Sequence, residues 1–379
     1  MSFFHKLFHQ PRKLWLRRAL FQIHLWVGVL LSLYIVIIAL TGSILVFRSE
    51  LTRALLPKNF SAYAPDRVAP LATVLDRFRT AYPGARLENI QMPSLQAPRF
   101  LLSATDNHQY AYTLLADPVT ADLRTKPRTW LDWTYDLHVN LLLGSAHGIQ
   151  VNGIGALGLL LLTFTGLVLW WPGIRTWVRG LGIGFKHNWR RINYDAHNAI
   201  GFWTFLIVTW WALSGIYFAW YRQFASAVAM ISPLQGMLSP VASTGPNLSP
   251  DRASLEQVLR AVHMASPNGR LFSLSDPFFS GTSVYALVDL RESGDFSHRD
   301  IITISTTDAR ILTIWHYGQN RTAGDWFLWA MHPLHFGTLW GMSIKILWAL
   351  CGLALAVLAI TGLLMYWNRF LRHQLRSAR

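Results

Sequence analysis

The chain has 379 residues, of which 52% are hydrophobic and only 14% are charged, and it contains 18 Trp. Soluble globular proteins carry about 25% charged residues, so this composition excludes an ordinary water-soluble protein. The formal net charge of +15 is typical of nucleic-acid-binding proteins. Most of that charge lies in short segments beside apolar stretches, however, which argues against nucleic acid as a partner.

Four apolar stretches are long enough to cross a lipid bilayer, which takes about 20 residues. Trp and Tyr cluster near their ends, as is usual where a helix meets the membrane surface. The sequence therefore predicts an α-helical membrane protein with four transmembrane spans. The predicted spans are residues 19–47, 150–171, 197–220 and 343–367.

The charges next to the spans predict the orientation of the chain. An amphipathic N-terminal segment, a loop and a tail, residues 1–18, 172–196 and 368–379, are short and basic. Short basic segments stay in the cytoplasm, so both termini are predicted to lie inside. The two long loops, residues 48–149 and 221–342, are nearly neutral and are predicted to lie outside.

Each long loop is predicted to hold a small α+β module followed by a surface helix. Helix-like stretches over residues 69–82 and 252–265 come first, and alternating strand-like runs follow. A turn comes late in each module, at 117–122 and at 306–309. The strand-like runs are residues 100–103, 110–115, 283–290 and 301–305.

The two halves of the chain share a spacing of small residues. A glycine lies 4 residues after both His24 and His197, and a Thr-Gly or Ser-Gly pair begins 17 residues after each histidine. We therefore predict two pseudo-symmetric repeats, each made of a span, an external α+β module, a surface helix and a second span. The matching pairs are Thr41-Gly42 with Ser214-Gly215, and Thr165-Gly166 with Thr361-Gly362.

Two histidines lie near the starts of the first and third spans, His24 and His197. An ionisable residue inside a membrane usually has a function, although a histidine bonded to a backbone carbonyl is the plain alternative for either alone. Two imidazoles from facing helices suit the two axial positions of haem iron, so we expect these two to ligate one haem. Gly28 and Gly201 either leave room for the flat ring or allow close helix packing.

A second set of histidines precedes the second and fourth spans. His138 and His335 stand 27 and 26 residues before a Thr-Gly pair, so they occupy equivalent positions in the two predicted repeats. We expect them to ligate a second haem. His332 and His147 are alternative ligands or neighbours of the ligands.

Other redox and metal centres fit the sequence less well. The single cysteine, Cys351, excludes an internal disulfide, a cysteine-ligated iron–sulfur cluster and a C-x-x-C-H haem attachment. Structural zinc usually takes four Cys or His ligands and no H-E-x-x-H motif is present, whereas copper at the second histidine set stays an alternative. Gly153, Gly155 and Gly158 fit G-x-G-x-x-G, but no strand precedes them, so we interpret them as a packing face.

Several segments resemble the PepSY-associated transmembrane family, and the similarity spans nearly the whole chain. The second module departs from the family pattern at 305–311, which lacks the Asp-Pro start of the turn. The resemblance implies a bacterial inner-membrane protein linked to iron uptake, as in FoxB-type siderophore reductases, which bind two b-type haems. The segments are residues 137–144, Thr165-Gly166, Trp170-Trp171, 332–337, Lys345, Thr361-Gly362 and the turn at 117–120.

Residues and resemblance together predict a haem-dependent ferric-siderophore reductase. Electrons from quinol or a cytoplasmic reductase would pass through two haems b to a ferric siderophore in the periplasm and release ferrous iron, with no catalytic acid or nucleophile. The alternative is a non-catalytic PepSY membrane module that binds a protein partner or restrains a peptidase. A metal or haem transporter has less support, because no predicted span is broken by proline at its middle.

Overall fold

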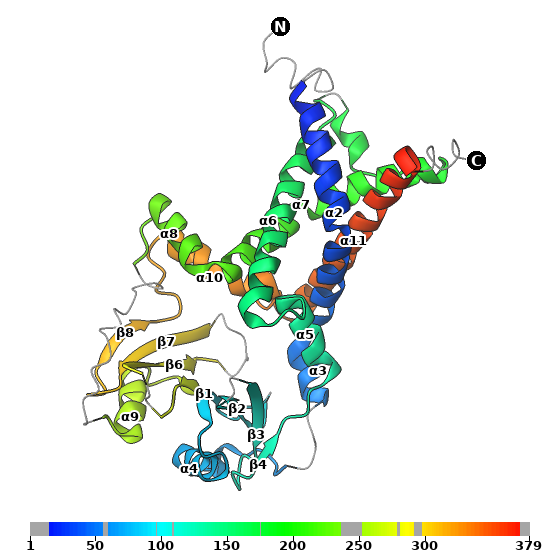
Figure 1. Ribbon diagram of the computed structural model, residues 1–379. Coiled ribbons are helices and arrows are strands. Elements are labelled where there is room, and N and C mark those ends of the chain that lie inside the picture. The colour runs from blue at the N-terminus through cyan, green and yellow to red at the C-terminus, as the bar shows by residue number, and fades with distance from the viewer. Residues whose placement is uncertain are drawn as a thin grey trace. The chain divides into compact units, whose positions relative to one another are not determined.

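The computed structural model describes residues 15–55, 60–95, 97–107, 110–174, 176–235, 252–278, 281–291 and 298–371. The chain divides into two compact units, a helical unit and a sheet unit (Figure 1). Most of the predicted N-terminal segment and of the predicted tail lies outside the described residues. The helical unit comprises Met1–Arg48, Trp130–Ser226 and Leu334–Arg379, and the sheet unit Ser49–Thr129 and Ala227–Pro333.

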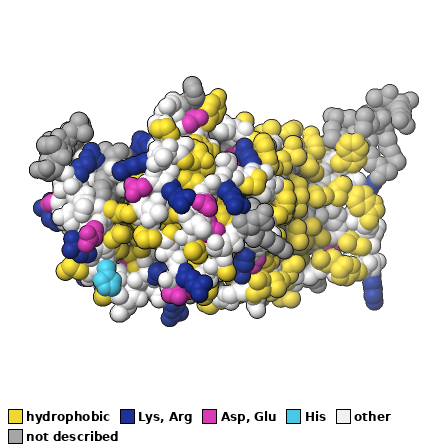
Figure 2. Space-filling view, turned by 90° about the horizontal axis from the view of Figure 1, so that it is seen from below, with side chains coloured by type: hydrophobic (Ala, Val, Ile, Leu, Met, Phe, Trp, Pro, Cys, Tyr) yellow, Lys and Arg dark blue, Asp and Glu magenta, His cyan; other side chains and the backbone are white. Residues whose placement is uncertain are grey.

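The helical unit is built on four long helices, which are long and apolar enough to cross a membrane, as predicted. Leucines on their outer surfaces stay exposed, including Leu30, Leu33 and Leu206. Exposed apolar side chains gather over the helical unit, whereas charged side chains gather over the sheet unit (Figure 2). A lipid bilayer is the solvent that fits such a surface. The helices are α2 (Trp15–Leu45), α6 (Ser145–Trp170), α7 (Trp189–Ala219) and α11 (Gly341–Tyr366).

The long helices extend beyond the predicted spans. Helix α7 begins at Trp189, well before residue 197, because Asn188 caps it: the Asn188 side-chain oxygen accepts a hydrogen bond from the Arg191 N–H at 3.1 Å. His197 therefore lies two turns inside the helix. Helix α11 continues into a π-helical turn over Trp367–Leu371.

The four long helices pack around a small apolar core. Glycines on α6 let the helices approach, because an added Cβ at Gly155 would overlap the Tyr34 ring and one at Gly158 would overlap Leu31. An added Cβ at Gly153 would meet Ala219 at 2.5 Å. The interpretation of this glycine motif as a packing face is confirmed. The core residues are Ile35, Ala39, Leu159, Leu162, Val208, Ala212, Leu355 and Ala356.

Shorter helices flank the long ones. Helices α5 and α10 precede α6 and α11, in the places where surface helices were predicted. The turn after α10 requires glycine, because Gly337 has a positive φ of 67° and an added Cβ would meet Trp348 at 2.8 Å. The shorter helices are α3 (Arg48–Leu55), α5 (Trp130–Asn140), α8 (Tyr221–Ile231) and α10 (Ala323–Phe336), with 3₁₀ turns at Pro65–Arg67 and Trp177–Gly180.

The sheet unit holds one antiparallel sheet with strand order β4-β3-β2-β1-β5-β6-β7-β8 (Figure 1), and two of its helices share an apolar core with that sheet. The helices, α4 (Leu71–Ala81) and α9 (Leu255–Ala265), lie where the sequence predicted them. The strands are β1 (Arg86–Gln91), β2 (Phe100–Thr105), β3 (Ala111–Ala116), β4 (Leu123–Thr125), β5 (Arg270–Ser275), β6 (Ser283–Asp289), β7 (Arg299–Ser305) and β8 (Ile311–Trp315).

The sequence predicted two separate external modules, whereas the structure joins them into a single sheet. Strand β1 of the first module pairs with β5 of the second, with Ile90 opposite Leu274. Both side chains are fully buried in the same apolar core as Phe78 and Val258 of the two helices. Pairing these strands therefore merges two small apolar cores into one, and it removes two unpaired strand edges.

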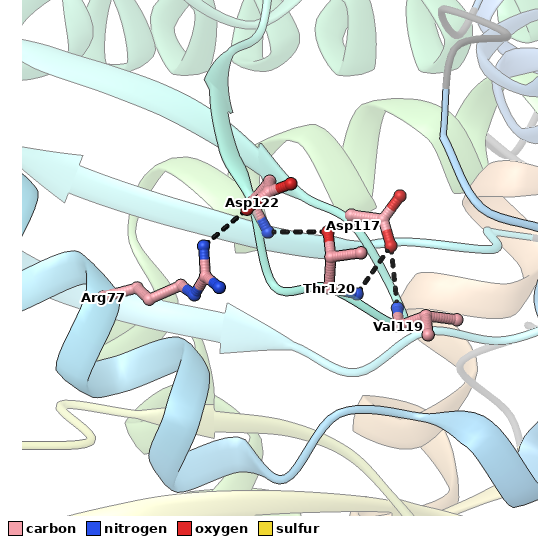
Figure 3. Close-up of polar contacts among 5 residues, drawn as sticks. All are labelled: Arg77, Asp117, Val119, Thr120 and Asp122. Carbon is pink, nitrogen blue, oxygen red and sulfur yellow. Dashed lines mark hydrogen bonds and ion pairs between the residues drawn. The ribbon is translucent and has the colours of Figure 1, made fainter.

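The predicted turn at 117–122 is organised by one carboxylate (Figure 3). Asp117 Oδ1 accepts hydrogen bonds from the N–H groups of Val119 (2.8 Å) and Thr120 (2.9 Å), and Oδ2 accepts one from the Ser61 N–H at 2.6 Å. Burial opposes ionisation, but these donors outweigh it and lower the pKa of Asp117 to about 2. Beyond the turn, Asp122 forms a surface ion pair with Arg77.

The second turn, at 306–309, has the same shape without the carboxylate. The Ser305 hydroxyl oxygen accepts a hydrogen bond from the Thr307 N–H at 3.3 Å and so replaces the aspartate. Ala309 has a φ of 56°, close to the 59° of Ala121 in the first turn. The loss of the Asp-Pro start therefore changes the hydrogen bonding of the turn and preserves its backbone.

Candidate functional site

Four of the predicted site histidines form two pairs in the helical unit. His24 on α2 and His197 on α7 have ring centroids 6.4 Å apart, and we call them the span pair. His138 on α5 and His335 on α10 have ring centroids 6.5 Å apart, and we call them the surface-helix pair. Each pair takes one histidine from each half of the chain.

The two pairs lie at opposite ends of the bundle. Thr41 contacts His138, and it lies 17 residues after His24 on the same helix. At 1.5 Å per residue this spacing corresponds to about 25 Å along the axis of α2. His197 and Ser214, which contacts His335, have the same spacing on α7.

Each ring of the span pair rests on a threonine of a neighbouring span. His24 Nδ1 lies 3.0 Å from Thr165 Oγ1, and His197 Nδ1 lies 3.0 Å from Thr361 Oγ1. His197 Nδ1 also lies 3.1 Å from the carbonyl oxygen of Leu358. The contact uses Nδ1 in both rings, so Nε2 points away from the hydroxyl.

In the surface-helix pair, too, Nδ1 of each ring lies next to a hydroxyl oxygen of a long helix. His138 Nδ1 lies 2.9 Å from Thr41 Oγ1, and His335 Nδ1 lies 2.6 Å from Ser214 Oγ. The ring of Phe218 packs edge-on against His335, with centroids 5.1 Å apart. Burial lowers the pKa of His138 to about 4, so its ring is neutral at pH 7 and keeps a nitrogen lone pair for a metal.

The glycine after each threonine makes room for the ring. An added Cβ would meet the histidine Cε1 at 3.0 Å from Gly42, 3.2 Å from Gly166 and 3.4 Å from Gly362. Gly215, after Ser214, differs, since its added Cβ would meet Ala156 at 2.9 Å. From the sequence alone, these Thr-Gly and Ser-Gly pairs indicate only a repeat. Their constant spacing from the histidines was the signal of this contact.

The surface helices are tied to the spans that follow them. Asn152 Nδ2 on α6 donates to the carbonyl oxygens of His138 (2.8 Å) and Val139 (3.1 Å), and the Tyr34 hydroxyl donates to Asn152 Oδ1 at 2.7 Å. On α11, Trp348 Nε1 donates to the carbonyl oxygen of Leu334 at 2.6 Å. These bonds hold the backbone next to both histidines. Sequence reasoning missed all three side chains.

The alternative histidines take different positions. His147 is exposed in the first turn of α6. His332 lies on α10 one turn before His335, and burial lowers its pKa to about 4. The ring that faces His138 is that of His335, so the geometry favours His335 over both alternatives.

A family model now places the chain among known proteins. The model of the PepSY-associated TM region matches residues 21–369. The chain belongs to the PepSY-associated TM region family. The match includes both histidine pairs, all four hydroxyl residues and the whole sheet. A comparison with curated proteins finds no match.

The donor set of this PepSY-associated TM protein suits a metal that brings most of its own ligands. Among the described residues, no group of three or more His, Cys, Asp or Glu side chains is arranged to hold a metal ion. Zinc takes three or four protein ligands, which neither pair supplies. Haem iron takes only its axial ligands from the protein, and two imidazoles are what each pair supplies.

The separation of the rings also fits a haem iron. A linear imidazole–metal–imidazole unit has about 2.0–2.1 Å for each metal–nitrogen bond and about 1.1 Å from each nitrogen to its ring centre, which places the centroids about 6.3 Å apart. The observed 6.4 and 6.5 Å are close to this value. A tetrahedral metal would draw the two rings closer together.

The last turn of α6, beyond Thr165, is fixed by an arginine of α2. Arg17 donates to the carbonyl oxygens of Val168 and Trp171, each at 3.0 Å, and to that of Leu169. Val168 and Leu169 belong to the last turn of α6, where a helix leaves carbonyls without an intrahelical partner. Arg17 therefore aligns the helix that carries the His24 contact with the helix that carries His24 itself.

Proposed function

We propose that this protein is a membrane oxidoreductase that binds two haems b, one between His24 and His197 and one between His138 and His335. The observation that carries the proposal is the repeated geometry of two rings at the spacing of a bis-imidazole iron, with Nδ1 of every ring next to a hydroxyl oxygen. Bound haem iron would supply reversible one-electron transfer. The protein's own residues orient the ligands and exclude water.

The room around the two glycines near the span pair supports a haem at that pair. An added Cβ would meet Leu162 at 3.7 Å from Gly28 and Leu358 at 3.6 Å from Gly201. Both distances are ordinary contacts, so close helix packing does not require glycine at these positions. Room for a flat ring beside His24 and His197 is the remaining explanation among the two that the sequence raised.

We further propose that the chain consists of two pseudo-symmetric repeats that meet at both histidine pairs. The support is that equivalent residues make equivalent contacts in the two halves, such as Thr165 with His24 and Thr361 with His197. Sites at the interface of such repeats are common in membrane proteins. One histidine from each repeat then completes each site.

The reaction that we propose is reduction of a ferric siderophore in the periplasm. With both termini in the cytoplasm of a bacterial inner membrane, the span pair lies toward the cytoplasm and receives electrons from quinol or a cytoplasmic reductase. The surface-helix pair lies toward the periplasm, and the ferric chelate accepts its electron on that side of the membrane. Ferrous iron binds hard oxygen chelators weakly, so electron transfer alone releases it.

The test is oxidation of the reduced protein by ferric siderophores. Detergent-purified protein is reduced with dithionite, excess reductant is removed, and hydroxamate, catecholate and carboxylate ferric chelates are added under anaerobic conditions. The proposal predicts that at least one chelate reoxidises the haem bands while a ferrous-specific dye captures iron. Failure of all three classes would reject the reductase and leave a haem protein.

A protein purified without any haem would reject the oxidoreductase itself. That result would favour a non-catalytic PepSY membrane module that binds a protein partner or restrains a peptidase. Haem that binds substoichiometrically and exchanges with added haem would favour a transporter. The visible spectrum of the purified protein distinguishes these two outcomes, because haem bands are absent in the first and present in the second.

A further inference from the structure

Each of the four hydroxyls that contact a site histidine also bonds to its own helix. The hydroxyls of Thr41 and Thr165 donate to carbonyl oxygens four residues earlier, each at 2.7 Å, and those of Ser214 and Thr361 do so at 2.8 Å. All four residues are buried, with at most 8% of their surface exposed. Such back-bonding is common for threonine and serine in membrane helices.

The single hydrogen of each hydroxyl decides the protonation of the ring. A carbonyl oxygen can only accept, so the hydroxyl hydrogen goes to the carbonyl. The hydroxyl oxygen is then an acceptor for the histidine, and Nδ1 must carry the hydrogen. The same conclusion follows for all four rings, because all four hydroxyls have the same pair of partners.

A second acceptor beside the His197 ring agrees with this assignment. His197 Nδ1 lies 3.1 Å from the carbonyl oxygen of Leu358, which cannot donate. Leu358 is the residue three before Thr361, so this threonine turn presents two acceptors to one N–H.

We infer that Thr41, Thr165, Ser214 and Thr361 are positioning residues, which hold all four histidines in the Nδ1-protonated tautomer before any metal binds. In this tautomer Nε2 has no hydrogen and offers its lone pair. The unprotonated Nε2 of each ring is thus ready to bind a metal. The role of these positioning residues in haem binding rests on the proposed function, whereas the assignment of the tautomer does not.

The consequence is a site that needs little rearrangement to accept the cofactor. Free histidine in water favours the other tautomer, which would place a hydrogen where the metal binds. Residues that bond the second nitrogen of a metal-binding histidine typically change metal affinity by 10–100-fold when they are removed. We expect an effect of that size at each hydroxyl, confined to the pair that it contacts.

The experiment compares isosteric and conservative variants of the full-length protein. Thr361→Val and Thr41→Val remove the hydroxyl with little change of shape, and Thr361→Ser and Thr41→Ser keep it. Thr204→Val is the matched control, because Thr204 is a buried threonine of α7 that donates to the Ile200 carbonyl at 2.8 Å. Haem affinity and midpoint potential are measured for each pair.

Thr361→Val is expected to weaken haem binding 10–100-fold at the span pair alone and to shift its midpoint potential. Thr41→Val is expected to do the same at the surface-helix pair. The serine variants and Thr204→Val are expected to match the wild type. Valine variants with wild-type affinity and potential would overturn the inference.

A second measurement keeps the inference testable if a valine variant misfolds or if no haem binds. Nitrogen-15 spectra of haem-free protein, labelled on histidine, report which ring nitrogen carries the hydrogen. The inference predicts four histidines with a protonated Nδ1 and a bare Nε2. Protonated Nε2 in these residues would contradict it, and a protein that binds no added haem but shows the predicted tautomers would reject the proposed function while supporting the inference.

Discussion

The first half of the chain, residues 15–171, and the second half, residues 189–371, make the same contacts to their histidines and differ in what supports them. A hydroxyl meets Nδ1 in all four cases, at 2.6–3.0 Å. By contrast, Asn152 supports the first surface helix and Trp348 the second. In the sheet unit, Asp117 organises the turn at 117–122 and Ser305 the turn at 306–309.

The two halves therefore differ in contacts that more than one kind of side chain can make. A hydrogen-bond donor to the backbone of a surface helix can be an amide or an indole, because only the N–H matters. Helices of 11–14 residues are marginal alone, so some tie is needed in both halves. The acceptor beside each ring is more restricted, since it must be a small hydroxyl on a helix that comes very close.

The largest expected effect is at the glycines that face the span pair, one in each half. Gly166→Val and Gly362→Val each push a branched side chain into a histidine ring that an added Cβ already meets at 3.2 or 3.4 Å. We expect each variant to lose the span-pair haem and retain the other. Haem quantification checks this, with Gly182→Val as control, since an added Cβ there meets nothing within 4 Å.

Equal losses from these two glycine variants would show that the span-pair site depends equally on both halves of the chain. Loss of haem in only one of them would contradict that equivalence. Loss of both haems in either variant would instead indicate that the bundle itself had failed.

The next effect is expected to be unequal between the halves. Asn152→Ala removes two donated bonds and the side-chain acceptor of the Tyr34 hydroxyl, which keeps the Asn152 carbonyl, whereas Trp348→Phe removes one bond and keeps an aromatic side chain. We expect roughly tenfold weaker haem binding at the surface-helix pair for the first, from loss of outer-shell bonds, and a smaller loss for the second. Titration of haem-free protein with haem measures both.

Tyr34→Phe supplies the control within this network, because it removes the two bonds of the Tyr34 hydroxyl to Asn152 and keeps both bonds that Asn152 donates. Its effect is expected to be smaller than that of Asn152→Ala. A span-pair haem that weakens equally in Asn152→Ala would contradict the assignment of Asn152 to the surface-helix pair.

The turns at 117–122 and 306–309 are expected to differ in how acid changes their stability. The pKa of Asp117 is about 2 in the folded protein, below its ordinary value of 3.8, so the carboxylate stabilises the fold above pH 4 and this contribution is lost as the pH falls from about 4 to about 2. The linked stabilisation is about 2 kcal/mol. Hydrogen exchange of β3 and β4 should therefore accelerate over that range in the wild type.

Asp117→Asn is expected to remove this dependence, and Ser305→Ala is expected to leave it in place because the second turn has no carboxylate at this position. Wild-type exchange with no change between pH 4 and pH 2, after correction for intrinsic rates, would contradict the role of Asp117.

The smallest effect is expected at the surface ion pair beside the first turn. Arg77 and Asp122 have side chains 49% and 53% exposed, and exposed pairs contribute about 0–1 kcal/mol. Arg77→Ala should change the stability of the sheet unit by less than 1 kcal/mol and leave both haems in place. Denaturant unfolding measures the change, and a larger loss would show that Arg77 does more than pair with Asp122.

Much of the fold could be predicted because it follows local patterns. Uninterrupted apolar runs indicate the spans, and alternation indicates strands such as 283–290. The joining of β1 to β5 could not be predicted, since Asn89 and Ser275 are far apart in sequence and nothing local selects the partner of an edge strand. The early start of α7 was missed because the cap at Asn188 lies within a charged loop.

The histidine pairs could be predicted because helices that enter from one side place His24 and His197 at one depth. The choice of His335 over His332 could not, as both lie on one short helix and only the packed structure shows which ring faces His138. The hydroxyl contacts were missed for a related reason. A Thr-Gly pair in a span is typical of helix packing, and its second partner lies on another helix.

The most direct test of the central claim is a count of haem per chain. Pyridine haemochrome analysis is done on detergent-purified wild type, on His24→Ala, on His138→Ala and on the double variant. The proposal predicts two b-type haems in the wild type, one in each single variant and none in the double variant. A colourless wild type, or haem content that the substitutions leave unchanged, would contradict it.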